Sequence, residues 1–180
     1  MTYWRMQLCP PSRREAVKHT IESLVAGYIG LDFATEVGDL REKEQAALPV
    51  SQRHYWGFAH EMQKGDLVLI IAHQFPVALV TVANAYSYAK SVSPENGLRF
   101  HHFRRIEDVR YYDDFQTNSL IWDRITMVDA ISRVRDPGSS SHRLIEEWRR
   151  LYALGVSGQP EIVASYLGHA RSPVPRLVPE

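Results

Sequence analysis

Some hydrophobic residues form dense runs and others recur at regular intervals along the chain, and this pattern predicts most of the helices and strands. Residues 66–73, DLVLIIAH, are too apolar for a strand with one face in water, so we expect a central strand buried on both faces. Residues 77–85 resume with Val, Leu and Thr after Gln-Phe-Pro at 74–76, which predicts a hairpin closed by a Pro-containing turn. Before the central strand, a helical segment ending at Gly65 is expected, with apolar positions Tyr55, Phe58, Ala59 and Met62.

The N-terminal pattern predicts a strand followed by a helix. Residues 2–8 alternate large and polar side chains and are expected to form a first strand. Ser12 with Glu15 three residues later is typical of a capping box. Gly27 is expected to end the helix, whose apolar stripe is predicted at Val17, Ile21, Leu24 and Val25.

Residues 27–39, GYIGLDFATEVGD, lack clear periodicity and indicate a short strand that runs into a loop. Glycines let a backbone approach a ligand closely, and Tyr28 and Phe33 are available to stack on a flat ligand. Taken alone, the same two aromatic residues are better explained as core residues, since most large aromatic side chains are buried. Residues 40–49 are charged and are expected to form a surface turn or helix.

By the same criteria, the C-terminal half contains a strand, a segment of either type, two helices and a tail. In residues 99–112, the apolar positions Phe103, Ile106 and Val109 do not alternate strictly, which favours a bulged strand. Residues 120–134 fit either strand or helix. Ser140 or Ser141 is expected to cap a helix that ends at Gly155. Its apolar face is predicted at Leu144, Ile145, Trp148, Leu151 and Tyr152. Residues 159–167 predict one more short helix, and the Pro-rich residues 171–180 are not expected to fold.

Composition narrows the class of protein. A chain of 180 residues with 44% hydrophobic content is able to bury one sizeable core. A formal net charge of zero argues against a polybasic nucleic-acid binder, although a local basic patch is compatible with it. The single Cys9 allows no internal disulfide, and there is no signal peptide and no apolar run of ~20 residues. We therefore expect a cytoplasmic protein with no membrane association.

The sequence contains none of the common catalytic motifs that we considered. It has no Gly-rich phosphate loop, no His-Glu-x-x-His and no Gly-x-Ser-x-Gly. His101 and His102 are adjacent in a predicted strand and point to opposite faces, which is poor geometry for one metal ion. We expect no catalytic residue, no metal and no cofactor.

Arginines concentrate at 99–112, where they are plausible phosphate ligands because the guanidinium group matches phosphate oxygens. Solvated strand charges explain these arginines equally well.

Four short motifs, in order along about 150 residues, give the chain a resemblance to the EVE domain, a branch of the PUA-like superfamily that includes the YTH readers. YWRMQLCP at 3–10 resembles the opening Tyr-Trp-x-x-Lys-x-x-Pro strand, with Gln7 in place of the lysine. MQKGDLV at 62–68 resembles the Met-Lys-x-Gly-Asp strand entry, DVRY at 108–111 the Asp-Val-Arg strand, and EWRRLYALG at 147–155 the closing Glu-Trp helix. GDL at 38–40 is similar to EVE-like modules of modification-dependent restriction enzymes.

The resemblance implies an α+β fold, a PUA-like twisted and barrel-like sheet flanked by helices, over residues 1–168, with 169–180 as a Pro-rich tail or linker. It also implies a pocket for a base flipped out of a nucleic acid and held between aromatic faces. A methyl group on the base adds apolar surface and so strengthens stacking on these aromatic faces. The expected base-binding residues are Trp4, Tyr28, Ile29, Asp32, Phe33, Tyr55, Trp56 and Tyr111.

We therefore expect a non-catalytic module that binds double-stranded DNA containing a methylated or hydroxymethylated base such as 5-methylcytosine. Phosphate contacts are expected from Arg53, Arg104, Arg105 and Arg110. The expected setting is a restriction or phage-defence system with a nuclease or NTPase domain downstream. The alternatives are an RNA-binding module of the same superfamily and an enzyme that acts on a nucleotide or small ligand.

Overall fold

A computed structural model describes residues 1–8, 13–33, 37–92, 99–112 and 124–153. The helices are α1 (Arg13–Val25), α2 (Trp56–His60) and α3 (Ser140–Ala153), with short 3-10 helices η1 (Leu40–Glu42), η2 (Gln45–Ala47) and η3 (Val50–Tyr55). The strands are β1 (Tyr3–Gln7), β2 (Tyr28–Leu31), β3 (Leu67–Ala72), β4 (Phe75–Val82), β5 (Ser87–Tyr88), β6 (His102–Tyr111) and β7 (Ile131–Arg133). Ser12 of the expected capping box, the helix expected at 159–167 and the Pro-rich tail lie outside the described residues.

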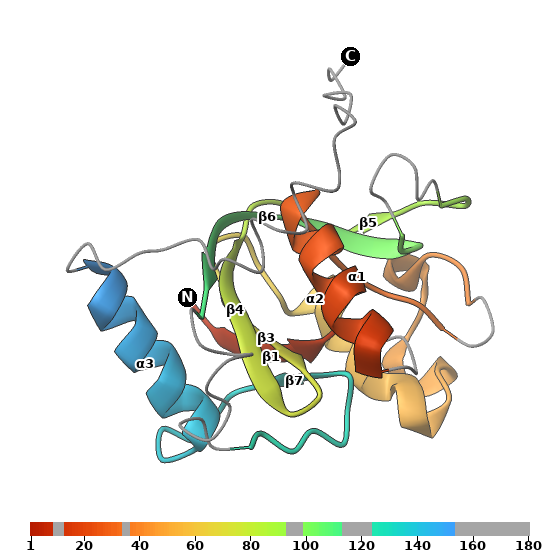
Figure 1. Cartoon of the computed structure of the whole chain (residues 1–180). Coiled ribbons are helices and arrows are strands. Elements are labelled where there is room, and N and C mark those ends of the chain that lie inside the picture. The colour runs from red at the N-terminus through yellow and green to blue at the C-terminus, as the bar shows by residue number, and fades with distance from the viewer. Residues whose placement is uncertain (9–12, 34–36, 93–98, 113–123, 154–180) are drawn as a thin grey trace, which may run out of the picture.

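The described strands form one mixed sheet in the order β2-β6-β4-β3-β1-β7, with β5 paired to β6. The β1–β3 pair is parallel and every other described pair is antiparallel. The sheet curls into a half-barrel, with α1 crossing in front of it and α3 beside it (Figure 1). The expectation of an α+β fold with a barrel-like sheet flanked by helices is confirmed at this level.

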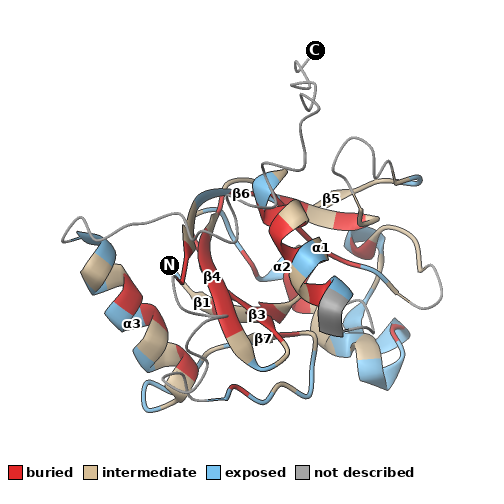
Figure 2. Ribbon diagram, in the orientation of Figure 1, coloured by how far each residue is buried: buried red, intermediate tan, exposed pale blue. Residues whose placement is uncertain are grey.

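Strand β3 is the centre of the core, as its apolar run predicts. All six of its residues are buried, and β4 beside it is buried along most of its length (Figure 2). The predicted turn at 74–76 is displaced toward the N-terminus. His73 and Gln74 form it with φ of 49° and 72°, a two-residue hairpin turn of positive φ. Pro76 lies inside β4, beside the register shift between Ile70 and Ile71, where a missing N–H is tolerated.

A buried carboxylate joins the parallel strands at their N-terminal ends. Asp66, 3% exposed, accepts from the backbone N–H of Thr2 at 2.7 Å and of Gln63 at 3.0 Å. It also accepts from the indole N–H of Trp4 at 3.1 Å. The start of β1 is thereby fixed to the start of β3, although more than sixty residues separate them in the chain.

The end of α1 follows the prediction from the sequence, and two other helix ends differ from it. Gly27, with φ of 82°, follows α1 and ends it as predicted, but Val25, its last residue and part of the predicted apolar stripe, is 44% exposed. The helix expected to run to Gly65 is replaced by η3 and α2, and it ends at His60. The N-terminus of α3 is capped by Ser139, whose hydroxyl accepts from His142 N–H at 3.2 Å, rather than by Ser140 or Ser141.

Strand β6 contains the bulge that the sequence predicted for this region. Asp108 has φ of 48°, and the register with β4 shifts beside it. The segment at 120–134, which fitted either strand or helix, contains the short strand β7. None of the helices that the structure describes is long and apolar enough to span a bilayer.

Candidate functional site

Five aromatic rings meet where β2 ends, β5 pairs with the start of β6, and η3 packs against them. This aromatic cluster consists of Phe33, Tyr55, Tyr86, Tyr88 and His102. The centroid of Phe33 lies 4.8 Å from that of Tyr55 and 4.8 Å from that of His102, both edge-on. Tyr88 and His102 are direct cross-strand partners with centroids 5.2 Å apart. The ring centroid of Tyr86 lies 6.1 Å from that of His102, with an interplanar angle of 25°.

The inner part of the cluster is held by hydrogen bonds. The Tyr86 hydroxyl lies 2.7 Å from Nδ1 of His102 and accepts from the backbone N–H of Leu40 at 3.2 Å. Burial raises the pKa of Tyr86 far above its usual range, so the hydroxyl stays protonated and has a proton to donate to His102. Phe33, Tyr55 and Tyr88 are only half-buried and form the outer part.

A fixed ion pair lies beside the rings. The Nε of Arg41 lies 3.1 and 3.0 Å from the two carboxylate oxygens of Asp39, and the guanidinium lies 5.8 Å from the ring centroid of Tyr86. The hydrogen bond from Arg41 lowers the pKa of Asp39, which keeps this carboxylate charged. The site therefore combines apolar ring faces with one strong acceptor and one strong donor.

The arrangement suits a flat heterocycle, but the rings are closed against each other. A base held between two ring faces needs them about 7 Å apart, twice the usual contact distance. Phe33 is packed edge-on against both Tyr55 and His102 at 4.8 Å. Phe33 is therefore the ring that has to move for a planar ligand to enter.

Two of the predicted base-binding residues, Phe33 and Tyr55, are brought together in the cluster. Two more are near them in the chain but are directed elsewhere. The carboxylate of Asp32 accepts from the backbone N–H of His101 at 2.9 Å. Trp56 stacks on His60, with centroids 4.2 Å apart and an interplanar angle of 12°, and its indole donates to the Lys43 carbonyl.

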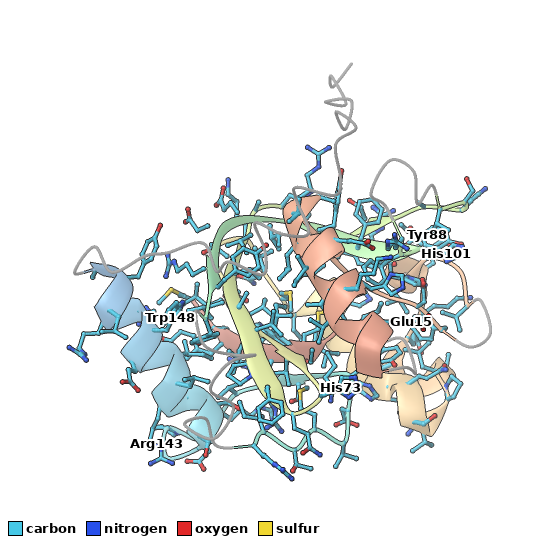
Figure 3. All side chains as sticks on the ribbon, in the orientation of Figure 1. Glu15, His73, Tyr88, His101, Arg143 and Trp148 are labelled. Carbon is cyan, nitrogen blue, oxygen red and sulfur yellow. The ribbon has the colours of Figure 1, made fainter. Side chains whose placement is uncertain are left out.

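The other four predicted base-binding residues are not in the cluster. Ile29 is fully buried in β2, and Tyr28, 9% exposed, packs edge-on against Phe103. Tyr111 lies at the opposite end of β6 from His102, on the order of 30 Å away if the strand were straight. Trp4 is bonded to Asp66 in the core. Figure 3 shows Tyr88 and His101 on the opposite side of the molecule from Trp148 of α3.

The prediction that Arg104 binds phosphate is corrected by its burial. Arg104 is 2% exposed, and its guanidinium donates to the carbonyls of Phe58, Asn84 and Ala59 at 2.8, 3.0 and 3.3 Å. Burial lowers the pKa of Arg104 to about 10, so the side chain remains charged at neutral pH. This arginine supports the core of the fold.

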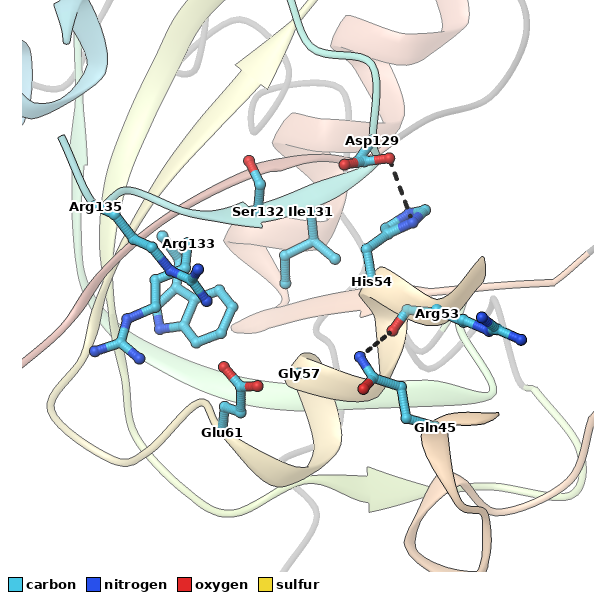
Figure 4. Close-up of a pocket in the computed structure, with 11 residues that line it drawn as sticks. Gln45, Arg53, His54, Gly57, Glu61, Asp129, Ile131, Ser132, Arg133 and Arg135 are labelled. Carbon is cyan, nitrogen blue, oxygen red and sulfur yellow. Dashed lines mark hydrogen bonds and ion pairs between the residues drawn. The ribbon is translucent and has the colours of Figure 1, made fainter. Parts of the chain in front are cut away.

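The remaining predicted phosphate ligands are placed differently from one another. Arg105 is exposed, with its guanidinium 5.8 Å from the ring centroid of Tyr28. Arg110 is half-buried against Tyr152, 3.9 Å from the ring centroid. Arg53 is exposed and, together with Trp4, lines a separate cavity between η3, α2 and β7 (Figure 4).

Sequence reasoning missed three members of the cluster, namely Tyr86, Tyr88 and His102. Tyr86 and Tyr88 are two residues apart in NAYSYAK, a spacing that places side chains on one face of an extended chain. That spacing was the available signal. The sequence indicates His102 as a partial charge of the basic stretch and as a poor metal ligand, and its position opposite Tyr88 depends on the β5–β6 register.

No protein-family model matches the chain, and no curated protein sequence matches it.

Proposed function

We propose that the chain is a non-catalytic, PUA-like module related to EVE domains, and that it binds double-stranded DNA containing a modified base. The flipped base enters the aromatic cluster. The observation that supports this proposal is the convergence of five rings from separate elements beside the Asp39–Arg41 pair. Ring faces of this kind favour a base that carries an additional methyl group, because the methyl adds apolar contact area.

The polar groups of the site match a base edge. A cytosine or adenine presents an exocyclic amino group, which a carboxylate accepts from, beside ring acceptors that a guanidinium donates to. Asp39 and Arg41 provide this pair next to Tyr86. The base replaces part of their mutual bonding, and Phe33 turns outward to open the space between the rings.

Phosphate contacts outside the pocket are assigned to Arg53, Arg105 and Arg110, without Arg104. Such contacts contribute affinity but no information on the base. In a restriction or phage-defence system, this module selects modified DNA for a nuclease or NTPase domain.

The test is binding to matched duplexes with plain cytosine, 5-methylcytosine, 5-hydroxymethylcytosine or N6-methyladenine, at one fixed salt concentration. We expect a preference of at least about tenfold for one mark, equivalent to about 1.4 kcal/mol. Phe33→Ala and Tyr88→Ala are expected to remove this preference while retaining the affinity for plain DNA. Arg105→Gln is expected to weaken binding to all duplexes equally.

Tyr111→Phe is the matched control, because it alters an aromatic residue at the other end of β6. Uniform binding to all four duplexes contradicts the proposal, and so does an equal loss in the cluster variants and in Arg105→Gln. Tighter binding to a matched RNA would indicate that the ligand is RNA and not DNA. Turnover of nucleic acid by the isolated chain would indicate an enzyme.

A further inference from the structure

A second potential site is the cavity of about 300 Å³ between η3, α2 and β7, which we call the β7 cavity. This volume is at the lower end of the range for small-molecule sites. Trp4, His54, Glu61, Arg133 and Arg135 are among its lining residues. Arg133 and Arg135 also line an adjoining hollow of about 470 Å³, so they form the rim that the two spaces share.

The two rim arginines have no partner among the residues that the structure describes. Both are exposed, and no hydrogen bond or ion pair joins their guanidinium groups to a described residue. They are two residues apart in a segment that stays extended beyond β7, since Val134 N–H donates to the Tyr3 carbonyl at 2.8 Å. Extended spacing directs both side chains to the same side. Two adjacent cations without counter-charges favour an anion, and phosphate matches the guanidinium geometry.

The lining of the β7 cavity also contains a carboxylate, which is a hydrogen-bond acceptor. Glu61, at the end of α2, is exposed and has no ion-pair partner within the described chain. Figure 4 shows the side chains of Glu61, Arg133 and Arg135 in the same part of the cavity lining, Glu61 at the end of α2 and the arginines in β7 and the residues after it. Trp4 also lines the cavity. A ligand that fits this lining has negative charge at one end and N–H donors at the other.

An unsatisfied polar atom lies in the wall of the same cavity. The Nε2 atom of His54 is buried and has no hydrogen-bond partner within the described part of the chain, while Nδ1 lies 3.4 Å from a carboxylate oxygen of Asp129. A buried polar atom without a partner costs free energy. The residues that line the cavity therefore include a third polar group, besides the rim arginines and Glu61, without a partner in the described part of the chain.

We propose that the β7 cavity binds a 5′-mononucleotide whose base has an exocyclic amino group. The phosphate lies against Arg133 and Arg135, and the amino group donates to Glu61. The ligand is a free phosphate monoester, and not a nucleotide within a strand. The proposal can be tested separately from modified-base binding, because neither Phe33 nor His102 lines this cavity. Arg53 lines the cavity and is also assigned a phosphate contact of the duplex, so it is not used to distinguish the two sites.

The experiment is isothermal titration calorimetry of the full chain with four probes: CMP, UMP, inorganic phosphate and a short single-stranded oligothymidylate. We expect CMP to bind with a dissociation constant of about 1 mM or tighter, and UMP and phosphate to bind more weakly. A variant with both Arg133→Gln and Arg135→Gln is expected to lose at least about tenfold in affinity for CMP, which is about 1.4 kcal/mol. Glu61→Gln is expected to remove the preference for CMP over UMP and to leave phosphate binding unchanged.

Arg143→Gln is the matched control, since it removes an exposed arginine of α3 that lies outside both hollows (Figure 3). Phe33→Ala is expected to bind CMP normally, which separates this site from the aromatic cluster. The absence of CMP binding at 10 mM, on the order of ten times the expected constant, overturns the proposal. Unchanged binding in the double arginine variant overturns it as well. Binding of the oligothymidylate without CMP binding assigns the arginines to a strand and also overturns it.

Discussion

At the scale of single residues, Asp66 fixes the geometry of the central strands. Its carboxylate accepts from three donors, two part-buried backbone N–H groups and the buried indole N–H of Trp4. When this acceptor is removed, all three donors lose their partner, and the indole does so in a buried position. The loss then exceeds the net value of the hydrogen bonds themselves.

Asp66→Ala is therefore expected to lower the free energy of unfolding by about 2–4 kcal/mol, and Asp66→Asn by less, since an amide oxygen still accepts. Urea unfolding followed by tryptophan fluorescence measures both values. A loss below about 1 kcal/mol for the alanine variant would show that the three donors find water or other acceptors.

Single residues also show where sequence reasoning succeeded and failed. Phe33 and Tyr55 were selected as base-binding residues and lie together in the aromatic cluster. Arg104 was selected as a surface cation, yet it shares its side of β6 with the buried residues His102 and Ile106. Alternation alone would have placed Arg104 inside. The prediction followed the general preference of arginine for the surface and not its place in the strand alternation, because arginine is seldom buried without an acid partner.

At the scale of elements, η3 connects the aromatic cluster with the β7 cavity. His54 lies in the wall of the cavity, and its ring centroid is 4.3 Å from that of Tyr55, which belongs to the cluster. Burial lowers the pKa of His54 below its usual value of 6.5, and the carboxylate of Asp129 partly opposes this shift. The native state therefore binds the His54 proton less readily than the unfolded chain does.

Above pH 6.5, His54 therefore does not affect how the free energy of unfolding depends on pH. Below that value, His54 lowers the free energy of unfolding, because the unfolded chain takes up the proton more readily than the native state does. His54→Gln is expected to lose less stability than the wild type between pH 7 and pH 5, measured by urea midpoints. Asp129→Asn is expected to lose more, because its carboxylate raises the pKa of His54. Equal pH dependence in wild type and His54→Gln contradicts this assignment.

Strands and helices with a clear hydrophobic pattern were predicted well. Turns and short helices, which depend on local backbone geometry, were not. The six buried residues of β3 follow directly from an uninterrupted apolar run. The hairpin turn is formed by His73 and Gln74, which adopt positive φ although neither is a glycine or asparagine. The 3-10 helices η1, η2 and η3 are three to six residues long, too short to show a helical period.

At the scale of the whole molecule, a net charge of zero limits binding to plain nucleic acid. With Arg104 buried, three of the predicted phosphate ligands remain. Each phosphate contact contributes about −0.9 to the slope of log affinity against log salt, so a slope near −3 is expected for the modified duplex. Arg105→Gln is expected to reduce the slope by about 1. A slope steeper than about −6 would require phosphate contacts beyond these arginines.

The arrangement of the strands in the whole molecule was the feature that could be predicted least from the sequence. The parallel pairing of β1 with β3 and the position of β6 between β2 and β4 depend on contacts between distant segments. Tyr88 and His102 become neighbours only through that pairing. The motifs supported a barrel-like α+β fold, but the composition of the aromatic cluster followed from the strand register.

The buried guanidinium of Arg104 also determines which parts of the molecule open together. Its three acceptors lie in α2 and in the connection between β4 and β5, while the side chain itself belongs to β6. A helix of five residues has almost no stability of its own. Amide hydrogens of α2 should therefore exchange with solvent only when β6 is released, at the slow rate of a sub-global opening and not at the fast rate of a fraying helix end.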